Sequence, residues 1–311
     1  MILTVTLNAA LDVTYSVPSL VAGSSHRVSV VSGRGGGKGA NVARVLAALG
    51  EPVTATGFIG GAVGARVAND LEAGGVRTDF VAIGGETRRS VTIMSADDGD
   101  ATVFNEPGPV VSRAEWALFV THFERFIGDY RVVVLSGSLP PGVPESAYAV
   151  LCATARAAGA RVIVDADGAA LRESLAAGPD VVKPNVHELA RMLGRPEAAA
   201  EDGAALLASG PEAVVVSDGP RGLVAFTPGG AWRAVPSETL RGNPTGAGDA
   251  AAAALARALA TGTPWPETLA DAVALSASAV LTPVAGSVDL PAYTRLRPHV
   301  KVTQLMAPSS G

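Results

Sequence analysis

The chain carries the stretch Asn243-Pro244-Thr245-Gly246-Ala247-Gly248-Asp249, which runs directly into an alanine-rich segment predicted to be a helix from Ala247 to Ala260. Because the first amides of a helix have no partner inside it, the Gly246-Ala247-Gly248 amides are predicted to be free donors for an anion. An acid in a first helical turn is often only a helix-dipole partner, but these glycines let a substrate approach the backbone beside Asp249. A carboxylate next to an anion hole suits phosphoryl transfer to a hydroxyl.

Outward from this stretch, short apolar strands alternate with helical patterns, which predicts βαβ units and a mainly parallel sheet. The strands are expected at Ile2–Leu7, Val53–Phe58, Arg131–Leu135, Arg161–Asp165, Asp180–Val182 and Ala213–Ser217. The further helices are expected at Gly39–Leu49, Ala62–Ala73, Pro144–Ala158, Gly168–Ala176, Val186–Leu193 and from Glu267 to about Leu281.

Two segments, residues 12–31 and 88–105, lack helical periodicity and alternate polar with apolar residues. This pattern is typical of antiparallel strands. Two strand inserts in an α/β chain predict a small β lid built from discontinuous pieces. The remaining residues, 1–11, 32–87 and 106–311, then form the α/β domain.

The composition excludes several classes of protein. The chain has 311 residues and a formal net charge of −5, which argues against a general binder of nucleic acid or of a membrane surface. The sequence contains no uninterrupted run of about 18 apolar residues, so a membrane span is not expected. Cys152 is the only cysteine in the sequence, so an intrachain disulfide is excluded. We therefore expect a cytoplasmic protein.

A second glycine-rich stretch runs from Gly33 to Asn41, with the sequence GRGGGKGAN. Gly35, Gly37 and Ala40 fit the G-x-G-x-x-A pattern of a dinucleotide site, but the next strand does not end in the acid that such a site needs. A Walker-type phosphate loop also fails, since Gly39 follows Lys38. Taken alone, this stretch fits either a ligand loop or a tight turn.

The two stretches together resemble the signatures of the ribokinase-like pfkB carbohydrate kinases, namely Gly36–Ala43 with Gly50 and Gly60 downstream, and Asn243–Ala254. The resemblance covers the chain from Leu3 to about Leu290. It implies a three-layer α/β/α fold whose mostly parallel central sheet lies between helices, with a small β lid over the sugar. This agrees with the lid expected from the pattern.

The resemblance implies a role for each matching residue. Asp249 matches the catalytic base, and Gly246, Ala247 and Gly248 match the anion hole. The residues that match sugar-binding positions are Asp12, Gly36, Gly37, Lys38, Asn41 and Ser138. The residues that match ATP-binding positions are Lys183, Asn185, Ser217 and Gly219.

Metal binding is implied in two places. Asn185 and Glu188 match an element that organises Mg²⁺ directly or through water, although Asn-x-x-Glu is by itself also an ordinary helix cap. A K⁺ site beside the anion hole is implied by the family, with backbone carbonyl ligands near residues 243–245 and 283–286.

Further elements resemble the branch of 1-phosphofructokinases and tagatose-6-phosphate kinases, among them Asn105-Glu106-Pro107-Gly108-Pro109. An acceptor phosphate requires cations near the sugar site, and the candidates are Arg27, Arg88 and Lys38. The sequence departs from this branch at Ser90 and at Asp165-Ala166-Asp167-Gly168. The leading expectation is therefore an ATP- and Mg²⁺-dependent kinase that converts fructose 1-phosphate to fructose 1,6-bisphosphate.

Several alternatives stay open. Within the branch they are tagatose-6-phosphate kinase and 6-phosphofructokinase activity. Within the fold they are a kinase of a neutral sugar or nucleoside, and a sugar-phosphate sensor without catalysis. A dinucleotide oxidoreductase is the weakest alternative, for the reason given above. The edge strands of the lid also predict a homodimer formed lid to lid, since exposed edges tend to be covered.

Overall fold

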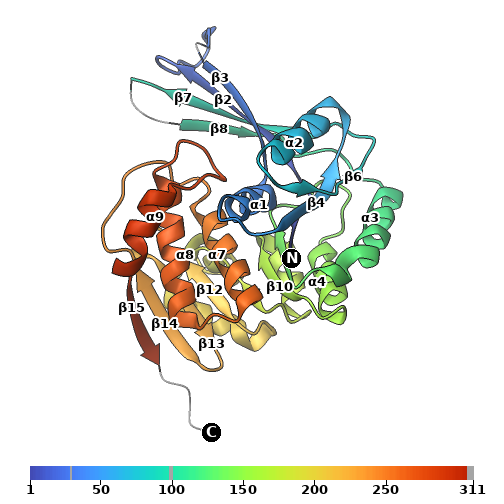
Figure 1. The fold of residues 1–311 in the computed structure, drawn as a ribbon. Coiled ribbons are helices and arrows are strands. Elements are labelled where there is room, and N and C mark those ends of the chain that lie inside the picture. The colour runs from blue at the N-terminus through green and yellow to red at the C-terminus, as the bar shows by residue number, and fades with distance from the viewer. Residues whose placement is uncertain (29, 98–100, 307–311) are drawn as a thin grey trace.

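A computed structural model describes residues 1–28, 30–97 and 101–306. Two sheets are present in these residues, a large one in the body and a four-stranded one beside it (Figure 1). Across the large sheet, the strands are β15 (Lys301–Met306), β14 (Gly230–Val235), β13 (Leu223–Thr227), β12 (Val214–Ser217), β11 (Val181–Val182), β10 (Arg161–Asp165), β9 (Val132–Ser136), β1 (Ile2–Thr6), β4 (Val53–Ile59) and β5 (Arg77–Thr78), with β6 (Val81–Ala82) also on β4.

The sheet is parallel from β5 to β12 and antiparallel from β12 to β15. The mainly parallel sheet is thus confirmed, whereas the antiparallel edge was not predicted. In β1, Ile2 packs on one side of the sheet and Leu3 and Val5 on the other. Because helices cover both faces, the central strands such as β1 and β9 are buried along their whole length rather than on alternate residues.

The helices lie in two layers around this sheet. They are α1 (Lys38–Ala48), α2 (Gly61–Ala73), α3 (Arg113–Phe126), α4 (Ala147–Ala157), α5 (Gly168–Leu175), α6 (Val186–Met192), α7 (Ala247–Thr261), α8 (Trp265–Val280) and α9 (Leu290–Leu296). Short 3₁₀ segments occur at Ile127–Asp129, Ala200–Ser209, Gly219–Arg221 and Arg297–His299. Among the described residues, no helix is both long and apolar enough to span a membrane.

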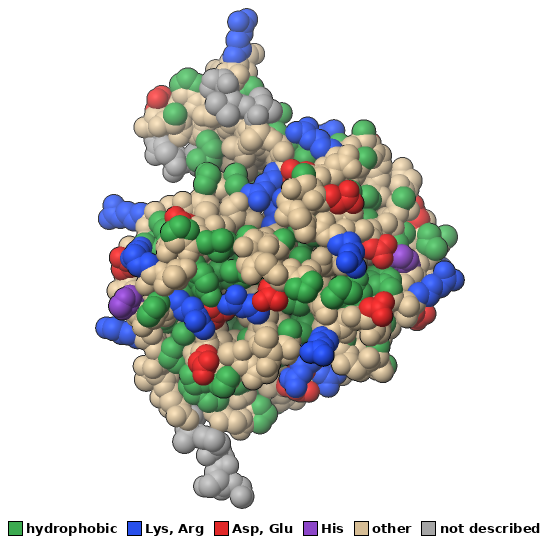
Figure 2. Space-filling view, viewed as in Figure 1, with side chains coloured by type: hydrophobic (Ala, Val, Ile, Leu, Met, Phe, Trp, Pro, Cys, Tyr) green, Lys and Arg blue, Asp and Glu red, His purple; other side chains and the backbone are tan. Residues whose placement is uncertain are grey.

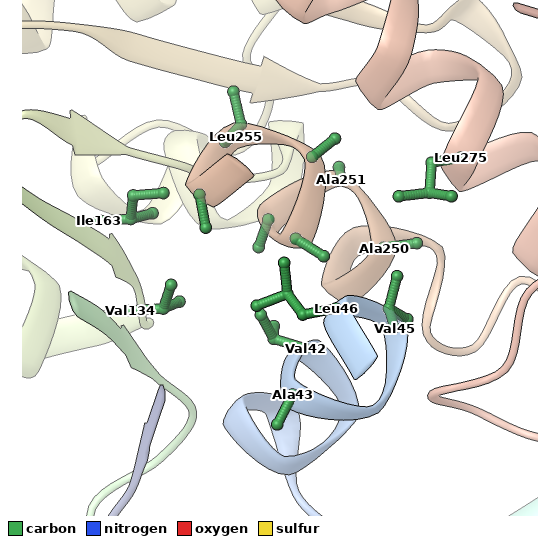
Figure 3. Close-up of a cluster of buried hydrophobic side chains, with 14 of the residues drawn as sticks. Val42, Ala43, Val45, Leu46, Val134, Ile163, Ala250, Ala251, Leu255 and Leu275 are labelled. Atoms are coloured by element: carbon green, nitrogen blue, oxygen red, sulfur yellow. The ribbon is translucent and has the colours of Figure 1, made fainter. Parts of the chain in front are cut away.

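Helix α7 is buried continuously from Asp249 to Ala256. Ala250 to Ala254 are fully buried, because α1, α8 and the strands β9 and β10 surround the helix. Figure 3 shows Leu46 of α1 pointing at α7, and Ile163 on the sheet at the side of α7. The small alanine side chains let these elements approach closely, so the position of Asp249 at the start of α7 is fixed by dense packing.

The four-stranded sheet, called the lid sheet here, has the order β3 (Val30–Gly36), β2 (Ala10–Val17), β7 (Arg88–Ser95) and β8 (Ala101–Asn105). These strands arise from the two segments expected to form the lid, of which residues 29 and 98–100 lie outside the described residues. The strands extend beyond the expected bounds, since Ala10 pairs with Gly36. Figure 2 shows the lid sheet standing apart from the body across a notch.

Candidate active site

The site is built around the start of α7. Gly246, the residue before the helix, has the left-handed φ of 89° that favours glycine. The amide of Ala247 donates to the carbonyl of Pro244 at 3.2 Å. The amides of Gly246 and Gly248 have no acceptor within the part of the chain that the structure describes. Two of the three predicted anion-hole amides are therefore available to a ligand, and the Ala247 amide is engaged.

Asp249 lies buried in the first turn of α7 and is held by α1. Its Oδ2 accepts a hydrogen bond of 2.8 Å from Asn41 Nδ2. Burial raises the pKa of Asp249 to about 7, helped by the nearby Asp165 carboxylate and opposed by Asn41, Lys38 and Lys183. A carboxylate with a pKa near neutral can take a proton from a hydroxyl and release it afterwards, which is the behaviour of a general base.

A group of four charged residues, which we call the ionic network, lies next to Asp249. Asp165 at the end of β10 contacts Lys38 Nζ at 3.1 Å and Lys183 Nζ at 3.2 Å, and Lys38 is also 3.6 Å from Glu188 Oε1. Burial alone would raise the pKa of Asp165, but the two ammonium groups hold it below its usual range. Asp165 in turn raises the pKa of Lys38. Asp165 and Lys38 thus stabilise each other's charged form before any ligand binds.

Lys183 connects this network to the anion hole. A Cβ atom built on Gly248 would lie 3.4 Å from Lys183 Nζ, so the ammonium group is next to the first turn of α7. The side chain of Lys183 is only 4% exposed. A phosphoryl group resting on the Gly246 and Gly248 amides would therefore meet this positive charge as well.

Asn185 and Glu188 form a capping box at the start of α6. Asn185 Oδ1 accepts from the amides of His187 and Glu188, and Glu188 Oε2 accepts from the amide of Asn185. The oxygen of Asn185 is thus committed to the helix, which disfavours it as a direct Mg²⁺ ligand. Glu188 Oε1 faces Lys38 and can bind a cation, and Mg²⁺ takes its remaining ligands readily from phosphates and water. The site fits Mg²⁺ in this way, through Glu188.

The other expected ATP-binding residues lie beside this cap. Ser217 ends β12, its amide donates to the carbonyl of Pro184 at 3.0 Å, and it pairs with Asn185 in an isolated β-bridge. Gly219 begins the 3₁₀ turn that follows, where Arg221 forms an ion pair with Asp218. Lys183, Asn185, Ser217 and Gly219 therefore all lie at or just after the ends of β11 and β12.

Asp12 lies on the polar face of the lid sheet. Its pairing partners are Arg34 on β3 and Ser90 on β7, and Arg88 is the next residue on the same face. A Cβ atom on Gly36 would lie 2.0 Å from Asp12 Oδ2, which explains the glycine at that position. Burial raises the pKa of Asp12 to about 6, against the opposing effect of the Arg88, Arg34 and Arg44 guanidinium groups.

The second glycine-rich stretch contains a tight turn, which is one of the two interpretations that the sequence left open. Residues 33–36 are part of strand β3, and Gly37, with a φ of 102°, makes the turn into α1. The stretch places Gly36 against Asp12 and, five residues later, Asn41 against Asp249. The two carboxylates consequently flank the start of α1.

The three cations expected to converge on an acceptor phosphate are separated within one chain. Arg88 is beside Asp12, and its Nε donates to the carbonyl of Asn8 at 3.2 Å. Lys38 instead points into the ionic network. Arg27 is exposed and lies beyond the Ser16–Val30 pair, four residues along β2 from Asp12, which is about 13 Å of strand. The cause is that β2 and β3 extend away from the body.

Ser138 is exposed and lies within reach of the lid side of the site. Its Oγ accepts from Asn8 Nδ2 at 3.1 Å, and the same amide group donates to the carbonyl of Pro107. The segment after β8 is thereby held over the end of β1. Next to it, a hollow of about 470 Å³ is lined by Glu86, Arg88, Glu106 and residues 107–110.

Sequence reasoning did not assign Asp165, Asn8 or Arg34 to the site. Asp165 and Asn8 could have been found, because Asp165 ends a parallel strand and Asn8 follows one closely, and ligands of α/β folds bind at these strand ends. Arg34 lies within the glycine-rich stretch and carries no such signal.

Comparisons with known proteins agree with this geometry. Residues 4–292 match the model of the pfkB family carbohydrate kinases. Phosphofructokinase-2 from Escherichia coli in complex with potassium is 29% identical, with a TM-score of 0.90, over 96% of this chain and 98% of that one. A possible 1-phosphofructokinase from Thermotoga maritima is also 29% identical, with a TM-score of 0.88, over 98% and 100%.

Ribokinase from Arabidopsis thaliana, solved with ribose and ATP, shares the fold at 23% identity and a TM-score of 0.73, over 95% of this chain and 98% of that one. The three-layer α/β/α fold with a mostly parallel sheet is thus the ribokinase-like fold. Kinases of the family use ATP and a divalent metal, and this chain is a phosphotransferase that acts on a sugar hydroxyl. The chain belongs to the pfkB family of carbohydrate kinases.

Proposed function

We propose that this kinase transfers the γ-phosphate of ATP to a hydroxyl of a ketohexose phosphate, foremost fructose 1-phosphate, which yields fructose 1,6-bisphosphate. The proposal rests on the surroundings of Arg88. This half-buried guanidinium lies beside Asp12, and in the described part of the chain no carboxylate oxygen is in ion-pair contact with it. A neutral sugar would leave this guanidinium group with only the carbonyl acceptors of Asn8 and Glu106, whereas a phosphate supplies an anionic partner.

The residues of the chain divide the reaction between them. Asp12 accepts hydrogen bonds from acceptor hydroxyls and Arg88 binds the acceptor phosphate. Asp249 takes the proton of the attacking hydroxyl while the hydroxyl oxygen forms a bond to the γ-phosphorus and the bond to the ADP oxygen breaks. The Gly246 and Gly248 amides and Lys183 stabilise the charge on the transferred group. Glu188 would hold the divalent metal, which would supply positive charge against the ATP phosphates.

The finer choice of acceptor rests on the branch elements of the sequence. Phosphofructokinase-2 from E. coli, 28% identical over 96% of this chain, has been solved with fructose-6-phosphate, so 6-phosphofructokinase activity is the second candidate. Tagatose 6-phosphate remains a third acceptor of the same chemistry. Ser90 on the polar face of the lid sheet donates to Asn105 Oδ1 at 2.8 Å and is the residue through which these sugars would be distinguished.

The experiment is a coupled ADP-release assay with Mg-ATP and fructose 1-phosphate, fructose 6-phosphate, tagatose 6-phosphate, fructose and ribose. We expect one phosphosugar to have a kcat/KM at least about 10²-fold above that of the neutral sugars. Turnover of a neutral sugar alone would refute the phosphate-binding role of Arg88. Binding of a phosphosugar without any ADP release would instead favour the sensor.

We also propose that two chains associate through their lid sheets. Val103 and Phe104 of β8 are 52% and 55% exposed, Val21 is 51% exposed, and β8 and β3 are edge strands. Exposed edges and apolar side chains of this kind are usually covered by another chain. Sedimentation velocity at micromolar concentration should show a dimer, and a Phe104→Glu variant should sediment as a monomer. A monomeric parent chain would refute the proposal.

A further inference from the structure

The loop that follows α8 supports the anion hole from behind. A Cβ atom on Gly246 would lie 2.9 Å from Ala285 Cα and 3.1 Å from the Gly286 amide nitrogen. On its other side, a Cβ atom on Gly286 would lie 2.9 Å from Asn41 Oδ1. The backbone of residues 285–286 is therefore wedged between the residue that begins α7 and the side chain that holds Asp249.

This loop is also where carbonyl ligands of a K⁺ ion were expected, but its carbonyls are already used. Arg34 Nη1 donates to the carbonyl of Ala285 at 3.2 Å, and Arg34 Nη2 donates to that of Gly286 at 3.4 Å. The carbonyl of Pro283 accepts from Asn243 Nδ2 at 3.0 Å. The carbonyl of Val284 accepts from Thr282 Oγ1 at 3.2 Å. All four carbonyls in residues 283–286 thus already have donors from side chains of this chain, and the loop does not fit a K⁺ ion.

Arg34 is an unusual residue for the inner part of a strand. It is half-buried, and its third contact is the hydroxyl of Ser287 at 2.6 Å. No carboxylate oxygen among the described residues forms an ion pair with it. Burial and the neighbouring Arg44 lower the pKa of Arg34, which Asp70 and Asp12 oppose, and an arginine stays charged in spite of such shifts. The guanidinium group therefore forms its hydrogen bonds with the loop behind the anion hole.

We infer that Arg34 is a positioning residue that acts as a built-in cation for the anion hole, so that this kinase does not need K⁺. The guanidinium holds the Ala285–Gly286 backbone against Gly246 and adds a fixed positive charge near the start of α7. Because Arg34 pairs with Asp12 across β3 and β2, the same side chain ties the lid sheet to the anion hole. The inference rests on the kinase activity of the family and not on the choice of acceptor.

The test compares kcat and the unfolding midpoint in about 0.1 M KCl and in the same concentration of tetramethylammonium chloride, which keeps the screening equal. The parent chain should have the same kcat in both salts, within about twofold. Arg34→Ala should lose about tenfold in kcat in tetramethylammonium, as expected when charged hydrogen bonds are lost. K⁺ or free guanidinium should restore most of that loss, and Arg34→Lys should lose less than Arg34→Ala.

Two further measurements separate this role from a structural one and from the acceptor assignment. K⁺ should raise the unfolding midpoint of Arg34→Ala and leave that of the parent unchanged, and this readout needs no acceptor. Arg89→Ala removes an exposed arginine of the lid sheet and should behave as the parent in both salts. Strong K⁺ activation of the parent, an unchanged kcat in Arg34→Ala, or a loss that neither cation restores would each overturn the inference.

Discussion

The charged side chains on the two sides of the site differ in how they are paired. On the nucleotide side, Asp165, Lys38, Lys183 and Glu188 neutralise one another within the chain. On the lid side, Arg88 lies beside Asp12 without an ion-pair contact among the described residues. The first side is fixed before a ligand arrives, because each charge already has a partner. The second side gains its missing partner only when an anionic acceptor binds.

The difference has consequences for what each side contributes. Charges that are paired in the folded protein hold groups in position but cost stability when one partner is removed. Arg88 has no carboxylate in ion-pair contact among the described residues, so its charge remains available to bind an anion. Substitutions on the nucleotide side should therefore affect folding as well as turnover, whereas substitution of Arg88 should affect mainly the binding of the acceptor.

The largest effect should come from Asp249→Asn, which removes the base that lies between the two sides. General-base catalysis contributes about 10²–10⁴-fold to the reaction rate. We expect kcat to fall at least about 10³-fold. Both ligands should still bind, which isothermal titration with a phosphosugar and with an ATP analogue can measure. Near-normal turnover would show that another group takes the proton.

The same variant should be no less stable than its parent. The pKa of Asp249 is about 7 in the folded chain, above the ordinary value of 3.8. The folded state therefore loses stability as the pH rises from 3.8 toward 7. Above pH 7 the folded chain holds a buried charge at this position. An asparagine side chain at this position carries no charge and avoids that cost. The unfolding midpoint of Asp249→Asn should equal or exceed that of the parent at pH 8, with a smaller difference at pH 5. A lower midpoint at pH 8 would point to a damaged fold.

Asp165→Asn should disrupt the nucleotide side. Removing one partner of a buried ion pair typically costs about 3–5 kcal/mol of unfolding free energy, and here Lys183 would be left buried beside an uncharged group. Lys38 adds less to this cost, because its side chain is 39% exposed. Denaturant unfolding measures the change.

Asp167→Asn is the matched control for this substitution. Asp167 lies two residues further on and forms an exposed ion pair with Arg191, which is worth about 0–1 kcal/mol. Asparagine also preserves the cap that Asp167 provides for α5. Equal losses of stability in the two variants would show that the ionic network is not what holds this side.

Arg88→Ala should weaken the binding of the acceptor alone. The KM for the phosphosugar should rise about 10²-fold, as expected for the loss of charged hydrogen bonds worth about 2–3 kcal/mol. The KM for ATP and the unfolding free energy should stay close to those of the parent. Arg89→Ala, which changes the exposed neighbour, should alter none of the three, and an unchanged acceptor KM in Arg88→Ala would remove the phosphate-binding role.

The sequence was most informative where backbone geometry dictates residue type. The alternation of apolar strands with helices predicted β1, β4, β9, β10 and β12 to within two residues. The stretch before Asp249 predicted the helix start, because glycines next to an acid suit few other structures. The antiparallel strands β13 and β14 were missed, since a short edge hairpin differs little in pattern from a loop.

Contacts between distant segments could not be predicted in the same way. Lys38 and Asp165 are 127 residues apart, and Arg34 and Ser287 are 253 apart. Nothing in the local pattern indicates that Lys38 points toward β10 rather than toward the acceptor, or that Arg34 crosses to the loop after α8. Such pairs depend on how the lid sheet and α1 are placed against the body, which the three-dimensional structure alone provides.

The smallest expected effect is a change in the pKa of Asp249, which lies between the two sides of the site. The kcat/KM for the acceptor reports the free enzyme and should fall about tenfold per pH unit below about pH 7, since Asp249 must be ionised to accept a proton. The Asp165 carboxylate raises the pKa of Asp249, and Lys38 and Lys183 lower it. Asp165→Asn removes the first effect and keeps the other two, so the pH at which kcat/KM begins to fall should decrease in the residual activity of that variant. Arg88→Ala, on the other side, should leave that pH unchanged, and a shift in Arg88→Ala equal to that in Asp165→Asn would mean that the two sides are not electrostatically distinct.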